Sequence, residues 1–212
     1  MISRLTGTIK KASSLGYGFN GITVFESDGT WTRPPWCRAI FVIVTSGGGG
    51  GGDGFNGGTA VGASGAGGGT EMSFLTEKDI TNATETVTIG AGGLDYLQQN
   101  WGSNGGTSSF GSHISVSGGA SSNGIGASGS DINFGSAGGK PPIGVSGNVG
   151  GHGMMSFWGG GAEGGLEATN GNFGNSTCFG SGGPSGAGNG ANPNTGEGGH
   201  GAPGVVVVYE FA

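Results

Sequence analysis

The chain has 212 residues, 57 of them glycine, with 9% charged residues and a formal net charge of −6. The length suits one sizeable domain or two small ones, and glycine so far above its usual share of about 7% is typical of low-complexity or disordered chains. Eleven Phe, four Trp and three Tyr oppose disorder, because disordered chains are poor in aromatic residues. We therefore predict a folded chain.

The charges are unevenly distributed along the sequence. Residues 1–38 carry most of the basic side chains, whereas the remainder is acidic and has no basic stripe, which argues against nucleic acid as a partner. A basic N-terminal end either docks on an acidic partner or is simply solvated. We predict that residues 1–21 form an attachment arm, with Arg4, Lys10 and Lys11 as the candidate contacts.

The sequence gives little evidence for a targeting signal or a disulfide. The first residues, MISRLTGTIKKASSLGYGF, lack the apolar region of a secretory signal, and no run of about 18 apolar residues is present to span a membrane. We expect a soluble chain made in a cytoplasm. Cys37 and Cys178 are the only cysteines, and a disulfide between them stays open, since secreted scaffolds of this size normally carry more cysteines.

Strand-like segments begin near residue 22. Residues 22–26 (ITVFE) and 38–45 (RAIFVIVT) flank a predicted turn over 27–35 (SDGTWTRPP), which Asp-Gly and Pro-Pro punctuate. Three further segments alternate apolar and polar side chains, as half-buried strands do: 70–76, 84–89 and 113–117.

The last strand-like segment, residues 204–211 (GVVVVYEF), is a β-branched run typical of a fully covered strand. No segment has good helical periodicity. The expected fold class is all-β, with a β-sandwich or jelly-roll-like core.

A glycine-rich excursion over residues 118–203 precedes this last strand. Structureless loops longer than about 15 residues are uncommon inside compact domains, and a strand as apolar as 204–211 must lie beside earlier strands. The excursion therefore starts and ends on one core. We predict a glycine-rich β domain over 22–212, with its strand core at 22–117 and 204–211.

The run SGGGGGGDG (46–54) directly follows a strand-like segment. Each glycine in an ordered element costs roughly 0.5–1 kcal/mol relative to alanine, so this composition needs a compensating gain. The missing Cβ lets backbones approach closely, as in the polyproline-II chains of collagen, and adjacent segments then exchange N–H···O=C bonds. We predict that the glycine tracts pack as polyproline-II (polyglycine-II) or extended segments joined by tight turns.

Motifs for catalysis or metal binding are scarce. No GxSxG occurs, and GGKPP (138–142) has proline where a phosphate-binding loop needs Ser or Thr. His152 and His200 lie in the contexts GHGMM and GHGAP, and His113 lies in SHISV. We interpret these histidines as polar residues of a backbone-dominated region rather than metal ligands, and expect no enzymatic activity, no metal and no cofactor.

Several aromatic residues lie among the glycines instead of on strands. Each of them either anchors its excursion in a small local core or is exposed at the tip of a turn. Exposed rings between Gly, Ser and Asn would form a binding surface of the kind that antibody loops use. The turns FWGGG (157–161) and QQNWGSN (98–104) are the best candidates, and the candidate receptor-binding residues are Trp101, Phe134, Phe157, Trp158, Phe173 and Phe179.

The order of these motifs resembles the glycine-rich domain of bacteriophage tail-fibre and tail-tip proteins. The composition is also similar to that of the long-tail-fibre adhesins of T-even-like phages, in which packed polyglycine-II helices display recognition loops. The chain departs from the pattern at PPWC (34–37) and at EKDITNATE (77–85). The matching blocks are GTWTRPPWCRAIFVIVTSGGGGGG (29–52), TEMSFLT (70–76), TVTIGAGG (86–93), GGTSSFG (105–111), ISVSGG (114–119) and GAPGVVVVYEF (201–211).

This resemblance implies a virion protein at the tail or fibre tip that binds a receptor on the bacterial surface, either a glycan or an outer-membrane protein. The N-terminal arm would attach it to other tail or fibre proteins, and a homotrimer would suit fibre symmetry. The alternative is a structural virion subunit that binds no receptor, such as a capsid decoration or tail assembly protein.

Overall fold

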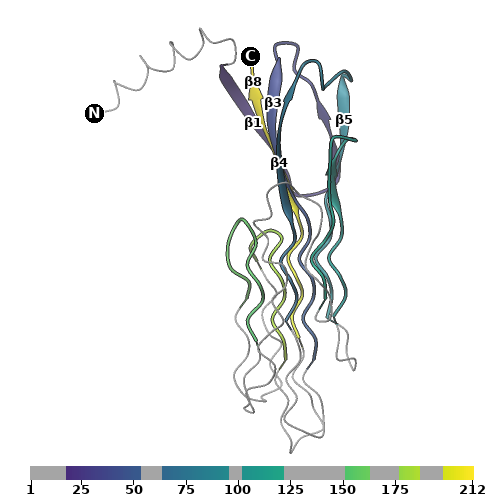
Figure 1. Cartoon of the computed structure of the whole chain (residues 1–212), viewed down its shortest axis with the longest axis vertical. Coiled ribbons are helices and arrows are strands. Elements are labelled where there is room, and N and C mark those ends of the chain that lie inside the picture. The colour runs from purple at the N-terminus through teal and green to yellow at the C-terminus, as the bar shows by residue number, and fades with distance from the viewer. Residues whose placement is uncertain (1–17, 54–63, 96–101, 122–150, 163–176, 187–197) are drawn as a thin grey trace, which may run out of the picture.

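The computed structural model describes residues 18–53, 64–95, 102–121, 151–162, 177–186 and 198–212. These residues form eight β-strands and no helix, so the all-β prediction is confirmed. Figure 1 shows two parts along the long axis: strands at one end, and a bundle of extended segments at the other.

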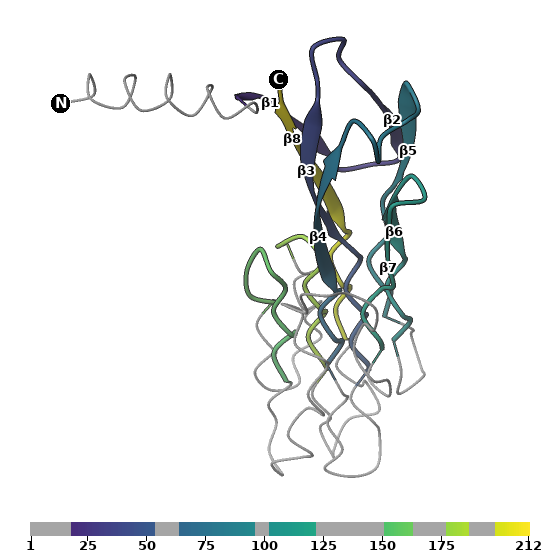
Figure 2. The ribbon, with the colours of Figure 1, turned by 45° about the horizontal axis from the view of Figure 1, so that its top comes forward.

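The strands form two antiparallel sheets that face each other (Figure 2). The first sheet has the order β1 (Phe19–Phe25), β8 (Val205–Phe211), β3 (Ala39–Thr45) and β4 (Thr70–Thr76). The second has the order β2 (Gly29–Thr32), β5 (Thr84–Thr88), β6 (Ser108–Phe110) and β7 (Ile114–Val116).

The prediction of a turn over 27–35 is wrong in its middle part. Residues 29–32 form β2, in which Trp31 pairs with Glu85 of β5 and is only 2% exposed. Alternating Thr-Trp-Thr suits a half-buried strand, and the flanking Asp-Gly and Pro-Pro merely bound it. The other segments predicted as strands are all strands, although β1 begins at Phe19 rather than at residue 22.

The core lies between the two sheets. Its large side chains include Trp31 and Phe110, whose ring centroids are 5.8 Å apart. The carboxylate of Glu210 is buried beside them and accepts hydrogen bonds from Trp31 Nε1 (2.8 Å) and Thr23 Oγ1 (3.0 Å). A buried charge needs such donors, because leaving it unpaired costs several kcal/mol.

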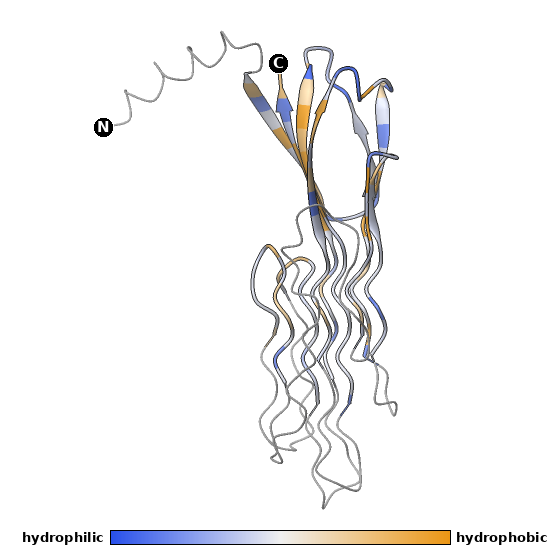
Figure 3. Cartoon of the chain, viewed as in Figure 1, coloured by the Kyte–Doolittle hydropathy of each residue, from blue (hydrophilic) through white to orange (hydrophobic). Residues whose placement is uncertain are grey.

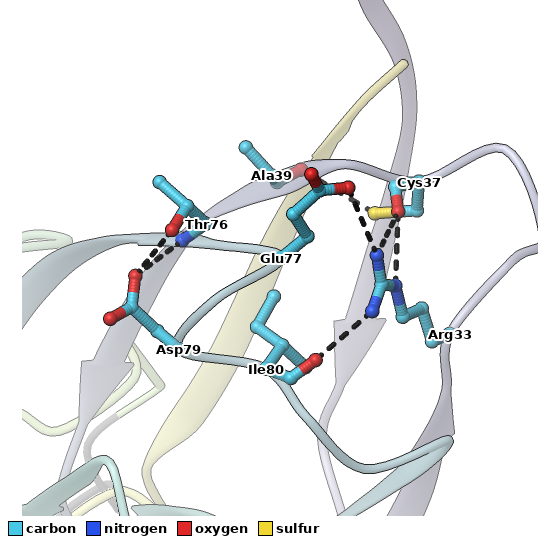
Figure 4. A network of polar contacts seen from close by, with 7 residues as sticks. All are labelled: Arg33, Cys37, Ala39, Thr76, Glu77, Asp79 and Ile80. Atoms are coloured by element: carbon cyan, nitrogen blue, oxygen red, sulfur yellow. Dashed lines mark hydrogen bonds and ion pairs between the residues drawn. The ribbon is translucent and has the colours of Figure 1, made fainter.

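Arg33 joins the β2–β3 connection to the β4–β5 connection (Figure 4). Its Nε and Nη2 donate to the carbonyl of Cys37 (3.0 and 2.9 Å), and its Nη1 donates to the carbonyl of Ile80 (3.0 Å). Burial raises the pKa of the Cys37 thiol. Cys37 and Cys178 are both free thiols, so the disulfide left open by the sequence is not formed.

Asp79 is expected to make stability depend on acidic pH. The hydroxyl and the backbone N–H of Thr76 donate to Asp79 Oδ2 (2.7 and 2.8 Å), which lowers the pKa of this carboxyl group. A lowered folded-state pKa adds stability above the unfolded-state pKa, and this contribution is lost as the pH falls through the folded-state value. We expect Asp79→Asn to lower the melting temperature at pH 7 but not near pH 2. An equal difference at both pH values would contradict this.

Six of the eight strands continue directly into the bundle. The segments 46–53, 89–95 and 117–121 leave the sheets from β3, β5 and β7. The segments 64–69, 102–107 and 198–204 return to β4, β6 and β8. The bundle therefore includes segments from the predicted strand core as well as from the excursion over 118–203.

The six-glycine run lies in the central segment of the bundle, residues 46–53. The N–H groups of this segment donate in turn to each of the three returning segments, with a period of three residues. Ser46 and Gly49 donate to 64–69, Gly47 and Gly50 to 102–107, and Gly48 and Gly51 to 198–204, at 2.8–3.1 Å. Three residues per turn is the repeat of a polyproline-II helix, so the predicted packing of the glycine tracts is confirmed for these residues.

The carbonyl groups of the central segment accept bonds from the segments that run parallel to it. Gly47, Gly48 and Gly49 accept from Gly119, Gly93 and Gly183, at distances of 2.8, 2.7 and 2.9 Å. The last donor belongs to residues 180–186, which complete a ring of six neighbours around the run. The buried backbone groups are thus paired.

Glycine is required in the central segment because its neighbours lie too close for a side chain. A Cβ built on any residue from Gly47 to Gly51 would lie less than 3.0 Å from a backbone oxygen of an adjacent segment. Asp53, which follows the run, is buried, and its Oδ1 accepts a hydrogen bond from the N–H of Gly198 (2.9 Å). The run is therefore a structural axis rather than a flexible linker.

Candidate functional site

The predicted tip FWGGG contains a tight turn beside the sheets. Ser156 and Gly159 form an antiparallel bridge with N–H···O distances of 2.8 and 3.4 Å, so Phe157 and Trp158 occupy the turn between them. Gly159 has a φ of 153°, which residues with side chains rarely adopt. The turn is confirmed, whereas its binding role stays a prediction.

Trp158 fixes this turn to the end of β3. Its Nε1 donates to Thr45 Oγ1 (2.9 Å), and Thr45 Oγ1 lies 2.8 Å from Thr70 Oγ1 on β4. Phe157 packs edge-on against Trp158, with ring centroids 4.9 Å apart and an interplanar angle of 87°. The turn is therefore at the sheet end of the bundle, not at its far end.

The two rings are partly open to solvent. Phe157 and Trp158 are each 37% exposed, and the neighbouring Met155 is 60% exposed. Large rigid rings supply contact area at a low cost in conformational entropy. This cluster could bind an apolar ligand surface by stacking and van der Waals contact.

Phe179 has a different environment from the turn. It is half-buried and packs on the outer face of the first sheet against Ile43, Val205 and Val207. The carbonyl of Phe179 accepts a hydrogen bond from Ser156 Oγ (2.5 Å). The structure therefore brings Phe179 close to Phe157 and Trp158, but in the position of an anchor.

The remaining candidate residues lie outside the described residues. These are Trp101, Phe134 and Phe173 among the receptor-binding candidates, and Arg4, Lys10 and Lys11 in the attachment arm.

Sequence reasoning missed two exposed apolar features. Met155 precedes the aromatic pair by two residues, and the context GHGMM gave no reason to expect it at a surface. Ile22 and Val24 are exposed on edge strand β1. The sequence did contain a signal for this exposure. Ile22 and Val24 alternate with Phe25, which places apolar side chains on both faces of the strand.

The histidines do not converge in the part of the chain that the structure describes. His113 Nε2 lies 3.3 Å from Glu85 Oε1, and His200 contacts the carboxylate of Asp95. No three His, Cys, Asp or Glu residues of these ranges gather in a way that could hold a metal ion. Among the same residues, no helix is long and apolar enough to cross a bilayer.

Comparison with known proteins gives one family. The sequence model of a glycine-rich domain matches residues 23–210, a range that includes most of both sheets and the bundle. No curated protein matches the chain. Because the match covers nearly the whole sequence, the chain belongs to the glycine-rich domain family.

Proposed function

We propose that this protein is a bacteriophage virion protein at the tail or fibre tip, which binds a receptor on the bacterial surface. The resemblance of the motif order to tail-fibre and tail-tip proteins supports this proposal. The observation that carries it is the shape of the molecule, because a bundle of backbone-bonded segments projects from the sheets.

The two ends of the molecule suit two different tasks. Gly18 and Ala212 exchange backbone hydrogen bonds (3.1 and 2.9 Å) at the sheet end, so the first and last described residues lie side by side there. The described segments of the bundle, such as 46–53 and 64–69, extend away from this point (Figure 1). An attachment end and a rigid projecting end are what a display platform needs.

The recognition surface in this proposal consists of aromatic rings among small residues. The rings of Phe157 and Trp158 are partly exposed beside the bundle. In the sequence, Trp101, Phe134 and Phe173 lie between described segments of the bundle. Rigid rings flanked by Gly, Ser and Asn suit either a glycan or an outer-membrane protein. Attachment to the tail or fibre would use the N-terminal arm with Arg4, Lys10 and Lys11.

The test is binding of the purified protein to cells of the bacterium that the phage infects. We expect Phe157→Ala/Trp158→Ala to weaken binding by roughly tenfold or more, since interface hot spots are commonly aromatic. Leu94→Ala is the matched control, because Leu94 is an exposed apolar side chain elsewhere on the bundle. Thermal melting of both variants checks that the fold persists.

Unchanged cell binding by a folded Phe157→Ala/Trp158→Ala variant would remove these two residues from the recognition surface. Absence of any cell binding by the wild-type protein would overturn the adhesin proposal.

A structural virion subunit without a receptor is the second candidate. The exposed apolar side chains of Ile22, Val24 and Phe74 on the first sheet favour it, because such surfaces commonly mark assembly contacts. Labelling the chain on intact particles separates the two candidates. A label on the capsid lattice favours the structural role, and a label at the tail or fibre tip favours the adhesin.

A further inference from the structure

The outer face of the first sheet is apolar across all four strands. In one register row, Ile22 of β1, Tyr209 of β8, Phe41 of β3 and Phe74 of β4 lie side by side. This face points away from the second sheet, since the core between the sheets uses the alternate residues of the same strands. Figure 3 shows the hydrophobic colour on these strands.

Aromatic rings form a continuous surface at the upper part of this face. The Phe211 ring lies 6.1 Å from the Phe19 ring and 5.9 Å from the Phe74 ring, across the small side chain of Ala39. The rings of Phe41 and Tyr209 are 6.1 Å apart. The face is therefore already ordered, so a partner would not have to organise it.

Part of this face is covered within the chain and part is open. Phe179 and Trp158 lie over its lower part, near Thr45. Above them, Phe19 is 60%, Ile22 is 52%, Val24 is 51% and Phe74 is 49% exposed. Contiguous exposed apolar patches of this kind mark interaction sites more often than isolated apolar residues do.

The outward side chains of the four strands carry no charge, although the chain has a net charge of −6. A strongly charged partner would find no complementary group on them. A second copy of the chain would meet no like-charge repulsion, because an uncharged apolar face is complementary to itself. These residues are Phe19, Ile22, Val24, Ala39, Phe41, Ile43, Thr45, Thr70, Met72, Phe74, Thr76, Val205, Val207, Tyr209 and Phe211.

We propose that a second copy of this chain covers this face, so that the first sheets of two copies pack face to face in a twofold dimer. Packed sheets lie about 10 Å apart with their side chains interdigitated. The open part of the face, four strands wide and about four residues long, has a projected area of roughly 260 Å². This open part is smaller than the roughly 800 Å² that each partner of a stable interface buries, so we expect a weak dimer whose population rises with protein concentration.

The edge of the same sheet supports burial in an assembly. β1 is the edge strand, and its sequence FNGITVF has no charged residue and no proline. Exposed edge strands usually carry charged residues or proline, because these residues prevent pairing with other chains.

The experiment is the mass of the full-length protein in solution as a function of concentration. We expect twice the 20.4 kDa of one chain for the wild type. Val24→Lys places a charge on the β1 side of the face and should weaken the dimer at least tenfold. Leu94→Lys is the matched control, because Leu94 on the bundle is also 51% exposed, and it should leave the mass unchanged.

Phe74→Lys separates face-to-face packing from pairing through the β1 edge. β4 is the opposite edge of the sheet, so this variant weakens a face-to-face dimer and leaves an edge-paired dimer intact. A monomeric wild type, a trimer, or a dimer insensitive to Phe74→Lys would overturn the proposal. A monomeric full chain that dimerises when residues 1–17 are removed would also overturn it, in favour of these residues as the cover. None of these outcomes depends on receptor binding.

Discussion

Gly49→Ala is expected to destabilise the protein by about 3 kcal/mol or more, because the new methyl group would overlap the backbone of an adjacent segment. The nearest atom to a Cβ on Gly49 is the carbonyl oxygen of Ala120, which cannot move away without breaking its own hydrogen bond from the N–H of Ala66. Overpacking typically costs about 1–3 kcal/mol, and a backbone obstacle is at the upper end of that range or beyond it.

The measurement for Gly49→Ala is thermal or denaturant unfolding of the purified protein. For a chain of this length, each kcal/mol lowers the melting temperature by about 2–4 °C, so we expect a fall of roughly 10 °C. Gly160→Ala is the control, because no atom lies within 4 Å of the position of its Cβ. Gly160→Ala should be neutral or slightly stabilising, since alanine restricts the unfolded chain. Equal effects of the two substitutions would contradict the close packing of the central segment.

Trp31→Ala is expected to cost about 3–5 kcal/mol, the usual range for removing a large buried aromatic side chain. Trp31 is 2% exposed and packs against Phe110 in the core between the sheets. Its loss also removes the Nε1 donor from the buried carboxylate of Glu210. Both effects act in the same direction, so the variant should unfold at a clearly lower denaturant concentration.

Trp31→Phe separates the two contributions. It keeps an aromatic ring in the core but removes the Nε1 donor, so Glu210 keeps the hydrogen bond from the hydroxyl of Thr23 and loses the one from Trp31. Loss of one partner of a buried polar group costs about 1–3 kcal/mol. Chemical denaturation of both variants measures the difference, and a Trp31→Phe variant as stable as the wild type would show that the hydrogen bond to Glu210 contributes little.

The strands were predictable wherever side chains carry a clear pattern. The β-branched runs that became β3 and β8 and the alternating run that became β4 were identified from sequence, because burial on one or both faces selects such residues. β2 was missed because Asp-Gly and Pro-Pro beside it are stronger local signals than four residues of alternation. The short β6 (Ser108–Phe110) has too few residues to show a period.

The candidate site was predictable only in part. The turn at Phe157 and Trp158 follows from aromatic residues beside glycines, but its attachment to β3 does not. The hydrogen bond from Trp158 to Thr45 joins residues 113 positions apart, and no local pattern records such a pairing. The anchoring position of Phe179 likewise depends on which face of the first sheet its segment crosses.

The sequence by itself determined that this chain is all-β and that its glycine tracts pack backbone to backbone, because a missing Cβ has value only where chains approach closely. Only the tertiary structure decided which six segments surround residues 46–53. It also decided that part of the apolar outer face of the first sheet stays exposed. The physical reason is that backbone N–H and C=O groups are the same in every residue, so glycine segments carry no side-chain pattern that specifies their neighbours. The two sheets determine which glycine segments become neighbours, because they fix where each segment leaves a strand and where it returns to one.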